Sequence, residues 1–292
     1  MAKKRTLTAA DQQRFRSILQ SATLGALMDS RRWQPGELAF QGGTCLHLAH
    51  GSARFSEDLD FMVRGGLSLQ GLSSQVQRRL QVLPGVPTDM AVTVAPSKEA
   101  RNPHAFMVTL GGPNVIGSAK VKIELWQTSE AALNSLKLVV RAIPTSTGLQ
   151  AFVPTLTLAE ILADKVYALG ARDRLKARDI FDLWWLCEQK AMTVQADSLC
   201  TRLDIYPGHN MNRAQTAHQW LAAAQLRLSD LSAVSTAAAV AADLKRWLPS
   251  SWKMDATVAA TMVAVSVQKL VEGAAVMTAR FPPADAAKGP AP

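Results

Sequence analysis

The chain has 292 residues and a mass of 31.5 kDa, with 32 Lys and Arg against 23 Asp and Glu, for a formal net charge of +9. Its 48% apolar and 19% charged residues exclude a largely disordered chain, and its length allows one large domain or two modest ones. The basic excess favours contact with a polyanion, and three distant cysteines without a CxxC pair argue against a disulfide framework or a structural zinc site and fit a reducing cytoplasm.

The N-terminal half predicts short helices and strands in alternation. Thr8 is a plausible N-cap for a helix over 8–31, in which apolar residues recur at helical spacing. A short apolar run over 38–40 precedes a pair of glycines, and a helix over 44–50, a strand over 59–63 and a helix over 68–83 follow. From 89 to 143 the pattern is β, with predicted strands over 90–95, 105–110, 121–126 and 136–143.

The C-terminal half predicts helices only. A capping box from Thr157 to Glu160 begins one helix, which Gly170 ends, and a second helix carries the apolar stripe Ile180, Leu183, Trp184 and Cys187. Further helices are expected near 212–228, 231–248 and 255–280. The apolar stretch over 256–267 is shorter than the roughly 20 residues that a membrane span needs, so no membrane contact is expected.

The fold class that follows is α+β, a small mixed β-sheet flanked by helices and followed by an all-α domain. We expect an α/β domain with an N-terminal helix over 1–150, a helical domain over 151–281 that completes its cleft, and a disordered tail over 282–292. The boundary is placed near 145–156, where Pro144, Gly148 and Pro154 cluster.

The stretch over 41–61 carries most of the chemistry. Gly42 and Gly43 let backbone amides approach a ligand closely, and a helix N-terminus beside Thr44 suits a phosphate. Asp58 and Asp60 are two residues apart on a predicted strand, so both carboxylates emerge on one face. Two carboxylates that close repel each other unless a cation lies between them, and magnesium is the natural one because it prefers oxygen ligands and substrate phosphates.

A third carboxylate, Glu124, lies on the predicted strand over 121–126, where apolar residues alternate with Lys122 and Glu124. Three carboxylates on one side of a sheet could hold two Mg²⁺ ions for displacement at phosphorus. Each piece also has a simpler interpretation: a turn at the glycines, a lone DxD in a loop, and a surface glutamate on an edge strand.

The motif GGTCLHLAHGSARFSEDLDF resembles the signature of the AbiEii/AbiGii toxin family of nucleotidyltransferases, within the DNA-polymerase-β-like superfamily. The spacing of Arg54, Ser56, Asp58 and Asp60 is more specific than the superfamily pattern, although Gln41 stands where the family usually has Lys. The resemblance covers roughly 36–190, because a second family block runs from Glu160 through Lys165 to the Arg-Asp-x-x-Asp-Leu motif that contains Asp179 and Asp182.

The resemblance implies an enzyme that transfers a nucleoside monophosphate from an NTP to an acceptor hydroxyl and releases pyrophosphate. Its implied catalytic residues are Asp58, Asp60, Lys165 and Asp179, its metal ligands for two Mg²⁺ ions are Asp58, Asp60 and Glu124, and its nucleotide-binding residues are Gly42, Gly43, Thr44, Arg54, Ser56, Lys165 and Arg178. The implied partners are an NTP, an RNA acceptor such as tRNA and a cognate antitoxin, with a role in phage defence.

Two other functions stay open. An NTP-binding interaction module without turnover would bind nucleotide with Mg²⁺ and release no pyrophosphate. A small-molecule nucleotidyltransferase that modifies an antibiotic would favour an acidic acceptor pocket, and the basic turn over 172–178 argues against one.

Overall fold

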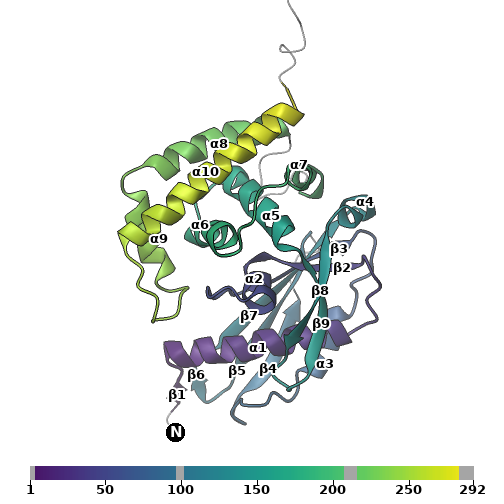
Figure 1. Ribbon diagram of the computed structural model, residues 1–292. Helices are drawn as coiled ribbons and strands as arrows, with labels where there is room; N and C mark the ends of the chain where they lie inside the picture. The colour runs from purple at the N-terminus through teal and green to yellow at the C-terminus, as the bar shows by residue number, and fades with distance from the viewer. Residues whose placement is uncertain (1–3, 97–101, 207–215, 283–292) are drawn as a thin grey trace, which may run out of the picture. The chain divides into compact units, whose positions relative to one another are not determined.

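The computed structural model describes residues 4–96, 102–206 and 216–282 (Figure 1). Contacts between residues divide the chain into two units. The sheet unit comprises Met1–Gly51, Ser56–Asn134 and Leu138–Leu156, and the helical unit comprises Ser52–Phe55, Ser135–Lys137 and Thr157–Pro292. Two short segments from the N-terminal half therefore belong to the helical unit, so the division does not follow a single cut in the chain.

The sheet unit is built on a mixed sheet of seven strands. In spatial order these are β4 (Ala91–Pro96), β5 (His104–Gly111), β7 (Ala119–Thr128), β3 (Leu59–Arg64), β2 (Leu38–Gln41), β9 (Gln150–Leu156) and β8 (Leu138–Pro144). The pairs β3–β7 and β2–β9 are parallel and the other neighbours are antiparallel. A separate two-stranded parallel sheet joins β1 (Arg5–Thr6) to β6 (Val115–Ile116).

Among its described residues, the sheet unit also contains four helices: α1 (Ala9–Asp29), α2 (Gly42–His50), α3 (Leu72–Arg79) and α4 (Glu130–Asn134). α1 begins with a full capping box between Thr8 and Asp11 and lies against β5, β7 and β9, where Phe15 and Leu19 enter the core. The helix predicted over 68–83 is shorter than expected, since α3 begins only after Gly71, whose φ of +74° is left-handed.

β9 was not predicted from the sequence, because its proline and the glycine before it were interpreted as a domain boundary. Pro154 lies within β9 and has no amide hydrogen to donate to a ladder. β9 pairs with β2 at a single register position, Phe40 opposite Thr155, whereas its pairing with β8 runs along the whole strand. A strand with so short a ladder on one side tolerates a proline there.

The helical unit contains α5 (Leu158–Ala171), α6 (Ala177–Trp184), a π-helical turn (Trp185–Gln189), α7 (Ala196–Ile205), α8 (Ala217–Ser232), α9 (Thr236–Leu244) and α10 (Ala256–Arg280). The sheet unit and this all-helical unit confirm the predicted α+β class. Gly170 does not end α5 as predicted. It lies one residue before the end of the helix, and the packing of Trp220 favours glycine there, since a Cβ at 170 would lie 2.6 Å from Cε2 of that ring.

α10 is long and apolar enough to cross a membrane by length and composition alone. Its buried stripe, which includes Ala259, Met262, Leu270 and Met277, packs against α5, α6, α8 and α9 (Figure 1). This burial is that of a central helix in a helical unit. The predicted disordered tail lies outside the described residues from 283 onward.

Candidate functional site

The start of α2 lies against the carboxylate of Asp60. The chain turns from β2 into α2 at Gly42, where φ is +78°, and a Cβ built on this glycine would lie 2.6 Å from Oδ2 of Asp60. Both the left-handed backbone and the close approach require glycine. The glycine pair predicted to hold phosphate therefore lies in contact with one of the two aspartates of the DxD motif.

Gly42→Ala is expected to lower the free energy of unfolding more than a matched substitution, Gly51→Ala, at the other end of α2. Gly51 has a φ of +79° and no atom within 4 Å of a built Cβ, so both variants carry the same backbone strain of about 1–2 kcal/mol, and only Gly42→Ala adds the clash with Asp60. Urea denaturation followed by circular dichroism measures the difference. Equal losses would show that the contact with Asp60 imposes no constraint.

Asp60 and Glu124 occupy paired positions on adjacent parallel strands, β3 and β7. Their neighbours Leu59, Phe61 and Ile123 are fully buried, so the two carboxylates share the opposite face of the sheet. Glu124 is partly buried and forms an ion pair with Lys122 on its own strand. The structure thus places the predicted third carboxylate beside the DxD motif, with a lysine as its present partner.

Asp58 lies one residue before β3, in a loop that two side chains hold. The buried hydroxyl of Thr44 donates to the backbone carbonyl of Asp58, which ties the first turn of α2 to this loop. The Gln20 amide, on α1, donates to the carbonyl of Ser56 at 2.7 Å and to that of Glu57 at 3.2 Å. Gln20 was not predicted as a site residue from the sequence. The available signal was a polar residue beside Leu19 in the apolar stripe of a helix.

The carboxylates of Asp58 and Asp60 are of the donor type that could hold Mg²⁺. Mg²⁺ keeps several waters and is commonly held by one or two carboxylates together with substrate phosphates. Within the described ranges, no group of three or more His, Cys, Asp or Glu side chains is positioned to hold a metal ion. Glu124 would have to leave Lys122 to become a third ligand, so its role as a ligand stays a prediction.

A buried ion network in the helical unit contains Lys165, Asp179 and Asp182 of the second motif. The Lys165 ammonium on α5 lies 2.9 Å from Oδ1 of Asp179 and 2.7 Å from Oδ2 of Asp182, both on α6. Arg54 forms a two-pronged pair with Asp182, with Nε–Oδ1 and Nη2–Oδ2 distances of 2.8 Å, and Arg172 pairs with Asp179. The network therefore joins three cations to two carboxylates.

In this network, neighbouring opposite charges offset the effect of burial on the pKa values. Burial alone would lower the pKa of Lys165, but Asp179 and Asp182 overcome it and raise that pKa. Burial would raise the pKa of Asp179, yet Arg172 and Lys165 hold it well below the usual range, and the pKa of Asp182 is lowered by Arg54 and Lys165 in the same way. Lys165, Asp179 and Asp182 are therefore charged near neutral pH.

The helical unit is expected to lose stability in acid. The native-state pKa values of Asp179 and Asp182 are lowered, so their stabilisation is present above the unfolded-state value of about 4 and is lost as the pH falls through the native values. Urea unfolding of the wild type and of Asp179→Asn at several pH values measures this. The wild type should lose more stability than the variant below about pH 4, and parallel curves would rule out a contribution from Asp179.

Two predicted nucleotide-binding arginines are already engaged within the helical unit. The Arg54 side chain is only 2% exposed, and its Nη1 donates to the carbonyl of Phe55 at 2.8 Å in addition to the pair with Asp182. The guanidinium of Arg178, on α6, lies over the ring of Trp247 at 4.3 Å from its centroid. Contact of either arginine with a nucleotide stays a prediction, and Arg54 is placed to position Asp182.

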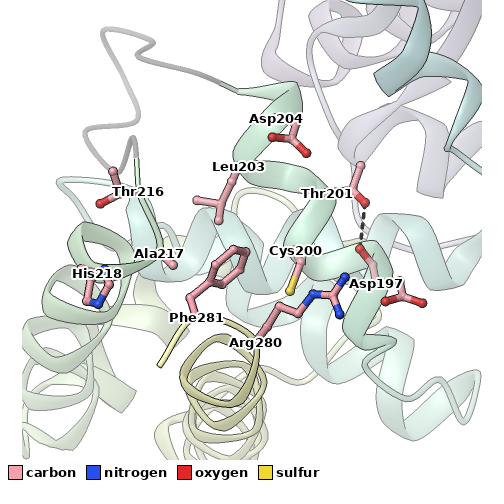
Figure 2. A pocket seen from close by; sticks show the side chains of 10 residues that line it. All are labelled: Asp197, Cys200, Thr201, Leu203, Asp204, Thr216, Ala217, His218, Arg280 and Phe281. Carbon is pink, nitrogen blue, oxygen red and sulfur yellow. Dashed lines mark hydrogen bonds between the residues drawn. The ribbon is translucent and has the colours of Figure 1, made fainter. Parts of the chain in front are cut away.

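The helical unit also contains a cavity of about 650 Å³ between α7, the start of α8 and the end of α10 (Figure 2). Asp197, Cys200, Asp204, His218 and Arg280 are among its lining residues. The Thr201 hydroxyl on its rim donates to the carbonyl of Asp197 at 2.8 Å. None of the predicted site residues lines this cavity, so the candidate site lies elsewhere.

Solved structures with related folds were found at low sequence identity. MenT4, a nucleotidyltransferase toxin from Mycobacterium tuberculosis H37Rv, has a TM-score of 0.51 and 16% identity over 94% of this chain and 86% of its own. An H. pylori protein assigned as a nucleotidyltransferase has a TM-score of 0.50 and 18% identity over 91% of this chain and 98% of its own. JHP933 from Helicobacter pylori has a TM-score of 0.48 and 20% identity over 94% of this chain and 99% of its own.

A comparison with curated proteins gave no match. The family model for the nucleotidyl transferase AbiEii toxin of type IV toxin–antitoxin systems matches residues 27–256, which include both motifs. That range contains the glycine pair, the DxD motif, Glu124 and the buried network around Lys165. The chain therefore belongs to the AbiEii family of nucleotidyltransferase toxins.

Proposed function

We propose that this nucleotidyltransferase is Mg²⁺-dependent and transfers a nucleoside monophosphate from an NTP to a hydroxyl of an RNA acceptor, with tRNA the first acceptor to test. The observation that carries the proposal is the grouping in the sheet unit. Asp60 is paired in register with Glu124, and Gly42 at the start of α2 lies against the Asp60 carboxylate. A phosphate-binding helix start beside two carboxylates is the arrangement that metal-assisted displacement at phosphorus requires.

In the proposed reaction, the acceptor oxygen forms a bond to the α-phosphorus as the bond to pyrophosphate breaks. Mg²⁺ held by Asp58 and Asp60 would neutralise charge on the phosphates. The backbone amides at Gly42 and Gly43, together with the α2 N-terminus, would bind the β- and γ-phosphates. Thr44 would act through its backbone amide, since its hydroxyl is bonded to the carbonyl of Asp58.

From the second motif, we assign Lys165 as the cation that binds the nucleotide phosphates. Its side chain is 10% exposed, and its ammonium is oriented by both Asp179 and Asp182. Because two carboxylates hold the ammonium, it stays charged and its side chain is restricted to few rotamers. Less side-chain conformational entropy is therefore lost when a phosphate binds. Asp179 thus acts by positioning Lys165 in this proposal.

Incubation of the protein with each α-labelled NTP, Mg²⁺ and bulk tRNA tests the reaction. The expected result is label on RNA together with pyrophosphate release, and both should be lost on removal of Mg²⁺ with EDTA. Nucleotide binding without pyrophosphate release would support an interaction module instead. Label on a small molecule such as an aminoglycoside, and none on RNA, would place the acceptor in another class.

Membership of the family implies a cognate antitoxin. We propose that the chain acts in the cytoplasm, where it would arrest growth by modifying RNA and so contribute to phage defence. Induced expression should stop growth, and Asp58→Ala should restore it. Arrest that persists in Asp58→Ala would contradict a catalytic origin of toxicity.

A further inference from the structure

The connection between α9 and α10 carries a basic and aromatic segment with the sequence KRWLPSSWK over 245–253. Lys245, Arg246 and Lys253 are exposed. Among the described residues, no carboxylate lies within ion-pair distance of Lys245 or Lys253, whereas Arg246 pairs with Asp243. The segment therefore presents positive charge to solvent with little neutralisation from its own unit.

Aromatic packing fixes this segment on α6. The guanidinium carbons of Arg178 and Arg246 lie over the ring of Trp247, at 4.3 Å and 5.3 Å from its centroid. Trp252 packs against Phe181 and Trp184 with ring centroids 5.5 Å and 6.1 Å away. Because the two guanidiniums are held over a ring, they lose less side-chain freedom when they bind an anion.

The start of α6 adds further cations to the element that carries Arg178. Arg174 and Lys176 have no ion-pair partner among the residues described, and they precede α6 directly. The pKa of Lys176 is lowered by burial and by the positive charge of Arg172 and Arg178, which exceeds the opposing effect of Asp179. This part of the helical unit therefore has an excess of positive charge beyond what its buried carboxylates neutralise.

We propose that Arg178 and Arg246, which lie over the ring of Trp247, together with the exposed Lys245 and Lys253 of segment 245–253, form a docking surface for the RNA acceptor, here named the α9–α10 basic surface. The proposal rests on the proposed function, in which the acceptor is RNA. Arginine and lysine bind backbone phosphates, and the flat face of a held guanidinium is a surface on which an unpaired base stacks. Trp247 itself is 9% exposed, so the arginines rather than the indole would meet the bases.

The test compares two triple variants that remove the same charge. Lys245→Gln/Arg246→Gln/Lys253→Gln removes three cations from the surface, and Arg32→Gln/Lys120→Gln/Arg141→Gln removes three exposed cations from the sheet unit. Binding of end-labelled bulk tRNA is measured by fluorescence anisotropy without NTP over a range of salt. The surface variant should bind at least about tenfold more weakly at low salt, and the slope of log K against log salt should become shallower by about 2.

The sheet-unit variant should stay within about threefold of the wild type. Equal losses in both variants, or an unchanged surface variant, would overturn the proposal in favour of diffuse attraction by net charge. Competition by polyglutamate as effective as that by unlabelled tRNA would also overturn it, since the surface would then take acidic protein. A double variant, Lys245→Gln/Lys253→Gln, leaves the stacking on Trp247 intact and should show about two thirds of the change in slope expected for the triple variant. This double variant keeps the test valid if the triple variant misfolds.

Parallel transfer assays separate this inference from the proposed function. If the wild type labels RNA and the surface variant binds tRNA as tightly as the wild type, the docking surface is contradicted and the transfer reaction is supported. If the wild type binds tRNA through this surface but releases no pyrophosphate, the transfer reaction is contradicted and the docking surface is supported.

Discussion

Asp60→Asn is expected to reduce nucleotidyl transfer by at least about a thousandfold while the protein stays folded. The substitution keeps the size of the side chain but removes the negative charge that would bind Mg²⁺, which supplies several kcal/mol of charge stabilisation in the transition state. Asp60 is partly exposed on the polar face of β3, so the neutral amide costs little in packing. Single-turnover transfer of labelled nucleotide to tRNA measures the loss.

The matched control is Asp29→Asn, an exposed aspartate at the end of α1 in the same unit. It removes the same charge and should keep full activity. Because Gly42 contacts Asp60, circular dichroism and the urea midpoint of Asp60→Asn must also match those of the wild type. A folded Asp60→Asn protein that retains transfer would rule out the DxD motif as the metal site.

Asp182→Ala is expected to lower the free energy of unfolding of the helical unit by about 3–5 kcal/mol, the largest stability effect that we expect in the chain. Asp182 is fully buried and binds both Arg54 and Lys165. Its removal leaves Arg54 as a buried cation with no carboxylate partner, whereas Lys165 keeps Asp179. Five of the seven tryptophans, at 184, 185, 220, 247 and 252, belong to the helical unit, so urea unfolding followed by tryptophan fluorescence reports mainly on it.

The double variant Arg54→Met/Asp182→Leu should recover most of this loss, because an apolar pair of similar volume removes both buried charges together. The exposed pair between Arg5 and Asp89 provides the comparison, and Asp89→Ala should cost less than about 1 kcal/mol. If Asp182→Ala costs no more than Asp89→Ala, the buried pair does not stabilise the unit. If the double variant is as unstable as the single one, the loss comes from packing and not from charge.

The sequence was sufficient for the parts of the fold in which local patterns and tertiary structure agree. Alternating apolar residues in β3 and β7 predicted the face that Asp60 and Glu124 share, and the structure pairs the two residues in register. Spacing along one strand could not reveal that register, since it depends on the partner strand. β9 was missed because Pro154 locally argues against a strand, and only the short ladder with β2 explains why the proline is tolerated.

In the second motif, local sequence patterns also fail to predict side-chain contacts between residues that are far apart in the chain. The i, i+3 spacing of Asp179 and Asp182 is that of residues on one helix face, and the structure places Lys165 between the two carboxylates. The partnership of Arg54 with Asp182 crosses 128 positions of the chain, and no local pattern encodes such a contact. Arg54 was therefore assigned to the nucleotide on the basis of family resemblance, whereas the structure pairs it with a buried carboxylate.

The long separation between Arg54 and Asp182 also bears on how the protein is made. Arg54 leaves the ribosome 128 residues before the carboxylate that neutralises it. At a synthesis rate of about 5–20 residues per second, the segment 52–55 waits roughly 6–25 s for its partner. During this interval the nascent chain carries the complete glycine pair and DxD motif without the helical unit. Completion of the helical unit is therefore the step that allows segment 52–55 to reach its final place, late in synthesis.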